Sequence, residues 1–173
     1  MKFNIEKFLS LDEYVTEERS ERRKTQNNKN GKSSSEFFTP YCIVKQMTDK
    51  ISSDILKDPT KTFMESSFGN GQFLIMILYK RIVEYSINWK IALETLYGVE
   101  LIESNVIEAR NRVHELLRNI APDYSPRVAN RIMNKNFVCH DFFTWKFEDW
   151  RPYTYEELHP KKRKKKENNN VEE

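Results

Sequence analysis

Apolar residues recur at helical spacing in three segments of the chain, 41–56, 72–87 and 104–120. Proline is tolerated in a first helical turn, so Pro40 fits the start of the first of these segments. Ser104 is the expected N-cap of the third. The pattern therefore predicts three helices.

Short apolar runs that suit buried strands separate these helical segments. They are KTFME at 61–65, LETLYGVEL at 93–101 and KNFVCHDFF at 135–143. Strands that alternate with helices are joined by right-handed crossovers into a parallel sheet. We therefore expect an α/β fold with helices on both faces of a parallel sheet.

The two ends of the chain differ in composition from its middle. Ser10 to Glu13 fit a capping box, which predicts a short helix over roughly residues 10–24. The following NNKNGKSSS favours a linker because Asn, Gly and Ser prefer turns. We expect a charged N-terminal arm at 1–35, a folded domain at 36–158 and a basic, disordered tail at 159–173.

The excess positive charge of the chain lies in this tail. The protein has 29 Lys and Arg against 26 Asp and Glu, and residues 1–160 hold 23 of each. A run of like charges is most often a solvated appendage, but a cationic tail can also bind nucleic-acid phosphates. A nuclear-import signal would depend on the same residues. The candidate nucleic-acid-binding residues are Lys161, Lys162, Arg163, Lys164, Lys165 and Lys166.

Cysteines and apolar stretches bear on the location of the protein. Cys42 and Cys139 stand 97 positions apart and form neither a zinc knuckle nor a redox pair, so we expect buried, reduced thiols and no metal site. The N-terminus lacks the apolar core of a signal peptide, and the longest apolar stretch, 73–79, is too short to span a bilayer. We expect a cytoplasmic protein that does not bind membranes.

Two of the four glycines follow the first predicted strand, in FMESSFGNGQFL at 63–74. Gly69 and Gly71 would form a tight turn before a helix N-terminus, where a ligand can approach the backbone closely. A turn with a purely structural role would use glycine as well. The motif on its own therefore leaves both interpretations open.

Acidic residues end the second and third predicted strands. Glu100 could accept both ribose hydroxyls of a nucleoside. Asp141 could accept from an adenine amino group, with Phe142 packed on the ring. Together with the glycines, these strand ends predict a cleft that fits adenosine.

Glu65 indicates which adenosine ligand the cleft would take. It precedes the glycines, and no lysine follows them until Lys80. A phosphate-binding turn often supplies a basic residue, whereas an acid repels an anion and attracts a cation. The sulfonium and ammonium groups of S-adenosylmethionine fit this charge.

Four segments in order, EFFTP, FMESSFGNGQFL, YGVEL and NFVCHDFF, resemble the cofactor-binding half of adenine-N6 DNA methyltransferases of the restriction-modification type. The resemblance covers residues 36–145. It implies a Rossmann-like methyltransferase fold that binds S-adenosylmethionine and methylates adenine in DNA. The cofactor-binding residues that it implies are Phe38, Thr39, Pro40, Glu65, Ser66, Gly69, Gly71, Phe73, Glu100, Leu101, Asp141 and Phe142.

The catalytic Asn/Asp-Pro-Pro-Tyr motif of that family is missing from the 173 residues. In the family, this motif holds the adenine amino group and stacks on the flipped base. The nearest match is WRPY at 150–153, which lacks the Asn or Asp. We therefore expect a truncated sheet whose first strand is an edge, with apolar surface near Phe63 that the aromatic segment 142–150, a partner or a second copy would cover.

Three functions are compatible with these observations. The first is an adenine-specific DNA methyltransferase, or the cofactor-binding part of a split one with a protein partner, as in a phage-type free-standing methylase acting in the host cytoplasm. The second is a catalytically inactive methyltransferase-like module that acts through protein interaction, such as interference with host restriction-modification. Methylation of a small molecule or a protein is the third.

Overall fold

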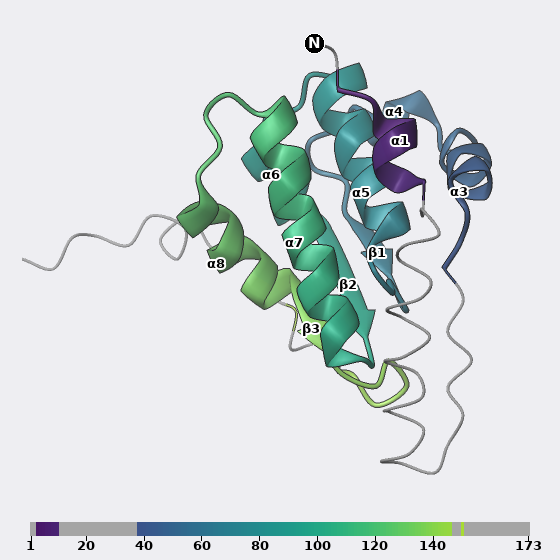
Figure 1. Ribbon diagram of the computed structural model, residues 1–173, viewed down its shortest axis with the longest axis vertical. Helices are drawn as coiled ribbons and strands as arrows, with labels where there is room; N and C mark the ends of the chain where they lie inside the picture. Colours follow the sequence, from purple (N-terminus) through teal and green to yellow (C-terminus); the bar gives the residue numbers. More distant parts are fainter. Residues whose placement is uncertain (1–2, 11–37, 147–149, 151–173) are drawn as a thin grey trace, which may run out of the picture.

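The computed structural model describes residues 3–10, 38–146 and 150; the predicted arm helix, linker and basic tail lie outside these residues. The three predicted strands form a parallel sheet in the order β1-β2-β3 (Figure 1). Their bounds are β1 (Phe63–Glu65), β2 (Leu96–Glu100) and β3 (Phe137–Cys139). The prediction of an α/β fold with a small parallel sheet is confirmed.

Helices precede and connect the strands. Before β1 lie α1 (Ile5–Leu9), α3 (Tyr41–Thr48) and α4 (Ser53–Leu56). Between β1 and β2 lie α5 (Gln72–Tyr79), the π-helix η1 (Lys80–Glu84) and α6 (Trp89–Glu94). Between β2 and β3 lie α7 (Glu103–Ile120) and α8 (Pro126–Asn136). The single helix predicted over 41–56 is divided in two, because Ser52 caps a new helix by accepting from the Asp54 amide.

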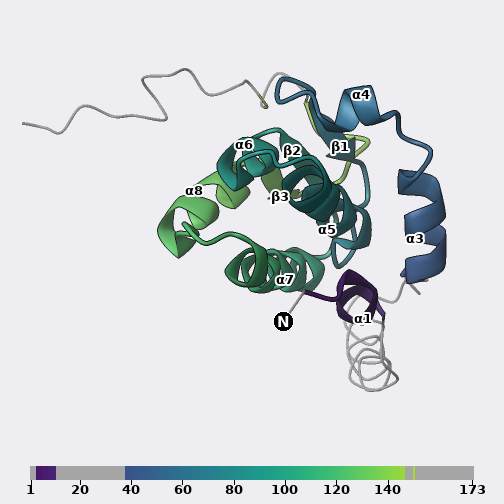
Figure 2. The ribbon, with the colours of Figure 1, turned by 90° about the horizontal axis from the view of Figure 1, so that it is seen from above.

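The two crossover helices α5 and α7 lie on the same side of the sheet and pack against each other (Figure 2). Strands that follow one another in a single direction through right-handed crossovers place their helices on one face. The crossover helices α5 and α7 therefore form one layer, and they do not cover both faces of the sheet as expected. On the opposite face, the Tyr97 ring meets Trp150, with ring centroids 5.4 Å apart.

The open side of β1 agrees with the prediction of an edge strand. Among the described residues, β1 pairs with β2 alone. Met64 in the middle of β1 is 45% exposed, opposite Tyr97 in register. Phe63 is half-buried beneath a guanidinium group, so the more exposed apolar side chain of the strand is Met64 and not Phe63.

The N-terminal residues 3–10 contribute to the core, so the prediction that they belong to a charged arm is wrong. The side chain of Leu9 is fully buried in the main apolar cluster. Phe3, Ile5 and Phe8 pack against the same cluster. The folded part of the chain therefore includes α1 as well as the described residues from position 38 onward.

The π-helix η1 places Arg81 beneath the amino ends of β1 and β2. The Arg81 side chain is fully buried, and its guanidinium carbon lies 5.0 Å from the Phe63 ring centroid. Nε donates to the Leu56 carbonyl at 3.2 Å, Nη2 to the Asp58 carbonyl at 3.0 Å and Nη1 to the Thr95 hydroxyl. This side chain fastens the loop before β1 to the amino end of the sheet.

Cys42 and Cys139 are exposed, so the expectation of buried thiols is wrong. In the part of the chain that the structure describes, no helix combines the length and the apolar character needed to cross a membrane.

Candidate functional site

The glycine turn follows β1 and requires glycine at both positions. Gly69 has a φ of 54° and Gly71 a φ of 86°, in the left-handed region that L side chains rarely adopt. A Cβ on Gly69 would lie 3.1 Å from Phe38 Cε1, and one on Gly71 would lie 3.1 Å from Ala109 Cβ. The structure thus brings Phe38 against the glycine turn, and the turn against α7.

Glu100 ends β2 and joins the turn to α7. It is 5% exposed; Oε2 accepts from the Gly69 amide at 2.7 Å, and Oε1 accepts from the Ile102 amide at 2.9 Å. Ile102 is the N-cap of α7, so the prediction that Ser104 caps this helix is wrong. An ionised carboxylate has about four acceptor positions, so these two bonds leave capacity for ribose hydroxyls.

Glu65 ends β1 and has a different environment. Its side chain is half-buried, and none of the described residues donates a hydrogen bond to its carboxylate. In register it lies opposite Gly98, which has no side chain that could contact it. Burial raises the pKa of the Glu65 carboxyl above its ordinary value. When this carboxylate is ionised, a cation or a hydrogen-bond donor from a ligand would stabilise it.

Asp141 follows β3 at the same edge of the sheet. It is exposed, and its Oδ1 accepts from the Phe143 amide at 2.9 Å in a local turn. The amide of His140 donates to the Glu100 carbonyl at 2.9 Å, which holds this turn beside the end of β2. Asp141 and Glu100 therefore lie at neighbouring strand ends.

Apolar side chains accompany these two carboxylates. Leu101, after β2, is 69% exposed, and Phe143, after β3, is 94% exposed. Phe142 is half-buried, with its ring centroid 6.0 Å from that of Phe143. These side chains give the carboxyl edge apolar surface on which a flat ring could pack.

The remaining predicted cofactor residues surround the turn. The carbonyl of Thr39 accepts from the Gln72 side chain at 3.2 Å, and Pro40 is the N-cap of α3. Ser66 is exposed, whereas Phe73 is half-buried against the core. The segment that contains Phe38 and Thr39 is therefore held directly beside the start of α5.

Two features that shape the turn could not be predicted from the sequence. The ring of Phe68 covers Gly98, where a Cβ would lie 2.4 Å from Phe68 Cδ1. Gln72 and Arg112 hold the turn from behind, with Arg112 Nη2 donating to Gln72 Oε1 at 2.8 Å. Gln72 stands next to Gly71 in the sequence, but its partner lies 40 residues further along, so no local pattern indicates the pair.

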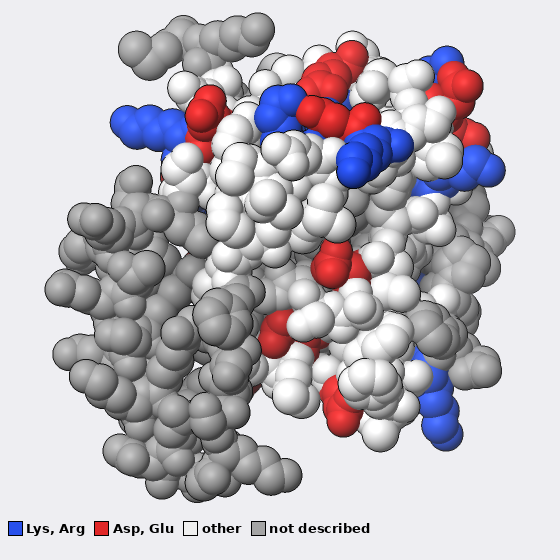
Figure 3. Space-filling model, turned by 90° about the vertical axis from the view of Figure 1, so that its right-hand side faces the viewer, with Lys and Arg blue, Asp and Glu red and all other residues white. Residues whose placement is uncertain are grey.

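Negative charge prevails at the strand ends. The predicted cofactor-binding residues include Glu65, Glu100 and Asp141 and no Lys or Arg. On the face shown in Figure 3, the middle of the described surface shows acidic side chains among uncharged ones, below a rim of mixed charge. No group of three or more His, Cys, Asp and Glu among the described residues could hold a metal ion. This charge distribution suits a cationic ligand better than a phosphate.

The structure thus groups Phe38, the glycine turn, Glu65 and Glu100 at the carboxyl edge of the sheet. Asp141 and Leu101 stand at the adjoining strand ends. In comparisons with known proteins, no protein-family model, no curated protein and no solved structure matches the chain.

Proposed function

We propose that the protein binds S-adenosylmethionine at the carboxyl edge of its sheet and is an adenine-specific DNA methyltransferase, or the cofactor-binding part of a split one. The observation that carries this proposal is the environment of the Glu65 carboxylate. Its half-buried carboxylate has a raised pKa and no hydrogen-bond donor among the described residues. The sulfonium and ammonium groups of the cofactor would give this carboxylate a positively charged partner.

The neighbouring strand ends support the nucleoside part of the ligand. Glu100 keeps acceptor capacity beyond its bonds to the Gly69 and Ile102 amides. Leu101 is exposed beside it and offers apolar surface to an adenine ring. Ligands of parallel α/β sheets bind outside the carboxyl ends of the strands, where all these groups lie.

Methyl transfer to adenine in DNA is supported by the resemblance of the four sequence segments. The chemistry requires groups that hold the adenine amino nitrogen and an aromatic ring that stacks on the flipped base. The 173 residues lack the motif that does this in the family, so the proposal gives them cofactor binding and assigns base capture to groups outside these residues, such as those of a partner protein. The basic run at 161–166, outside the described residues, would contact DNA phosphates.

Isothermal titration calorimetry of the full chain tests cofactor binding. We expect saturable binding of S-adenosylmethionine and none of ATP, which carries the same adenosine with the opposite charge. Glu65→Gln should weaken binding about tenfold or more, because the amide keeps the shape and removes the charge. Asp49→Asn is the matched control, since Asp49 is a carboxylate bound to Lys80 at the far end of α5.

Three results would contradict the proposal: no saturable binding of S-adenosylmethionine, equal affinities for ATP and S-adenosylmethionine, or an unchanged affinity in Glu65→Gln. Transfer of a labelled methyl group to DNA in the presence of host extract tests the catalytic part. Glu100→Ala is a less selective variant, because Glu100 also holds the Gly69 amide.

A second function, that of a non-catalytic module acting through protein contact, is favoured by the open edge of the sheet. Among the described residues β1 has one neighbouring strand, and Met64 is 45% exposed on the face that lacks α5 and α7. Strand edges and apolar surface favour association with another chain. Co-purification with a host restriction or modification subunit that persists in Gly71→Arg would support this function.

A further inference from the structure

A continuous polar connection runs behind the glycine turn from α1 to α7. Gln72 Nε2 donates to the carbonyl of Leu9 at 3.0 Å and to that of Thr39 at 3.2 Å. Gln72 Oε1 accepts from Arg112 Nη2, and Arg112 Nη1 donates to the Asn70 carbonyl, both at 2.8 Å. One buried amide and one guanidinium therefore join four separate parts of the chain.

The carbonyls that accept these bonds lie where the backbone offers few donors of its own. Leu9 is the last residue of α1, Thr39 precedes α3 and Asn70 lies inside the turn between the two glycines. Carbonyls at helix ends and in turns need donors from side chains or water. Gln72 is only 3% exposed, so an apolar side chain in its place would leave these groups unpaired away from water.

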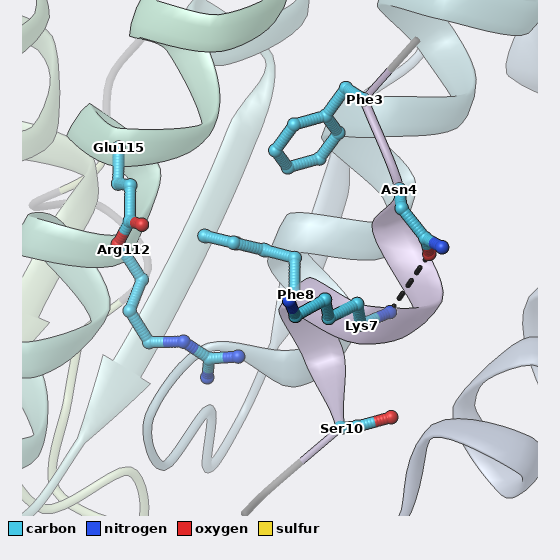
Figure 4. Close-up of a pocket in the computed structure, with 7 residues that line it drawn as sticks. All are labelled: Phe3, Asn4, Lys7, Phe8, Ser10, Arg112 and Glu115. Carbon is cyan, nitrogen blue, oxygen red and sulfur yellow. Dashed lines mark hydrogen bonds between the residues drawn. The ribbon is translucent and has the colours of Figure 1, made fainter. Parts of the chain in front are cut away.

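Helix α1 depends on this connection for its position. It has five residues, too few for a helix that is stable without tertiary contacts. Leu9 enters the core, and the Phe8 ring centroid lies 5.7 Å from Arg112 Cζ. Figure 4 shows Phe8 of α1 and Arg112 of α7 reaching toward one another across a cleft of about 440 Å³. The arginine that holds the turn thus also contacts α1 through Phe8.

We propose that Gln72 and Arg112 are positioning residues that fix the glycine turn, and that docking of α1 onto Gln72 is part of forming the cofactor site. The inference depends on the proposed function for the identity of the ligand. It goes beyond that function by adding the N-terminal residues to the site. The mechanical consequence is direct: the turn carries the Gly69 amide that binds Glu100, so a displaced turn disturbs both groups.

The first test needs no ligand. Hydrogen exchange is measured at the Gly69 amide, which donates to Glu100, and at the Gly71 amide, which donates to the Phe68 carbonyl at 2.8 Å. Gln72→Leu should raise these rates about tenfold, because it removes the acceptor that holds Arg112, the donor to the Asn70 carbonyl of the turn, and the donors to the Leu9 and Thr39 carbonyls. Global stability is measured in parallel, so that the local rates are compared under conditions where each variant is folded.

Two further variants separate positioning from a general loss of stability. Arg110→Lys is the matched control, because Arg110 lies on the same helix and donates to the Phe137 carbonyl at 2.7 Å instead of to the turn. It should leave the exchange of the turn amides unchanged, whereas Arg112→Lys should raise it. Gln72→Glu keeps an acceptor for Arg112 but cannot donate to Leu9, so it should speed exchange in α1 more than in the turn.

The second test is titration with S-adenosylmethionine. Gln72→Leu should raise the Kd about tenfold, while Arg110→Lys binds like the wild type. Wild-type binding with an unchanged Kd in Gln72→Leu and unchanged turn exchange overturns the inference and leaves the proposed function standing. Absence of wild-type binding together with faster turn exchange in Gln72→Leu overturns the proposed function and leaves the positioning role standing.

Discussion

The two ends of β1 differ in whether a nearby charged side chain has hydrogen-bond partners within the protein. At the amino end, Arg81 is fully buried, and acceptors of the protein itself bind it through Nε, Nη1 and Nη2. At the carboxyl end, Glu65 is half-buried, and none of the described residues donates to it. A satisfied buried charge fastens the fold, whereas an unsatisfied one at the carboxyl edge of a parallel sheet indicates a place for a ligand.

The largest effect is expected where the charge is satisfied. Arg81→Met should lower the free energy of unfolding by about 3 kcal/mol, because it removes the donor to the buried Leu56 carbonyl and to the partly buried Asp58 carbonyl. Urea unfolding measures the loss. Affinity for S-adenosylmethionine, measured at a temperature where the variant is folded, should not change. A loss of affinity without a loss of stability would remove the contrast between the two ends.

Gly98→Ala comes next, because it acts on the fold and the site together. The new Cβ would meet Phe68 Cδ1 at 2.4 Å and push the ring that covers the strand. Overpacking of this kind costs about 2 kcal/mol and should displace the glycine turn as well. Thermal unfolding and cofactor titration should both show a loss. Normal affinity in this variant would mean that the position of Phe68 does not affect the site.

Unlike the two preceding variants, Glu65→Gln should make the folded protein more stable than the wild type at neutral pH. A raised pKa means that Glu65 keeps its proton to higher pH in folded protein than in unfolded protein. The stability that the protonated carboxyl contributes is therefore fully present below the ordinary pKa of 4.5, and it is lost as pH rises through the pKa of the folded state. The variant has no such loss. In the absence of ligand, the Tm of Glu65→Gln minus that of the wild type should therefore increase as pH rises above 4.5. A difference in Tm that does not vary with pH would show that the carboxylate is already stabilised.

Leu101→Ser should have the smallest effect on the fold. The side chain is 69% exposed, so the free energy of unfolding should change by less than about 0.5 kcal/mol. If adenine packs on this side chain, affinity for S-adenosylmethionine should fall several-fold. Parallel urea unfolding and calorimetry measure the two quantities. An unchanged affinity would place the adenine ring elsewhere along the edge.

The three strands and the helices α5 and α7 between them could be predicted from the sequence, because the strands are short apolar runs between helical patterns; helix α8 was not predicted. The bounds of the elements were predicted less well. Strand β1 is limited to Phe63–Glu65, and the predicted helix at 41–56 is interrupted by a turn. Helix α6 is six residues long and gives too little periodicity to be recognised. The placement of α1 depends on burial of Leu9, which only tertiary contacts decide.

The site was predictable where it is local and unpredictable where it is not. The glycines and the acids at the strand ends stand in contiguous motifs, and parallel strands bring their carboxyl ends to one edge. The bond of Glu100 to the Gly69 amide spans 31 positions, and that of Arg112 to Asn70 spans 42. Such contacts follow from the packing of the turn against β2 and α7, which residue spacing alone does not determine.

The most direct test of the central claim is a titration of the Glu65 carboxyl by carbon-13 NMR, with its signal assigned by its loss in Glu65→Gln. In free protein we predict a pKa above the ordinary value of 4.5, as burial requires. Addition of S-adenosylmethionine should lower this pKa, because a nearby cation favours the ionised form. A pKa that stays the same when the cofactor is added would contradict the claim that this carboxylate binds a cationic ligand.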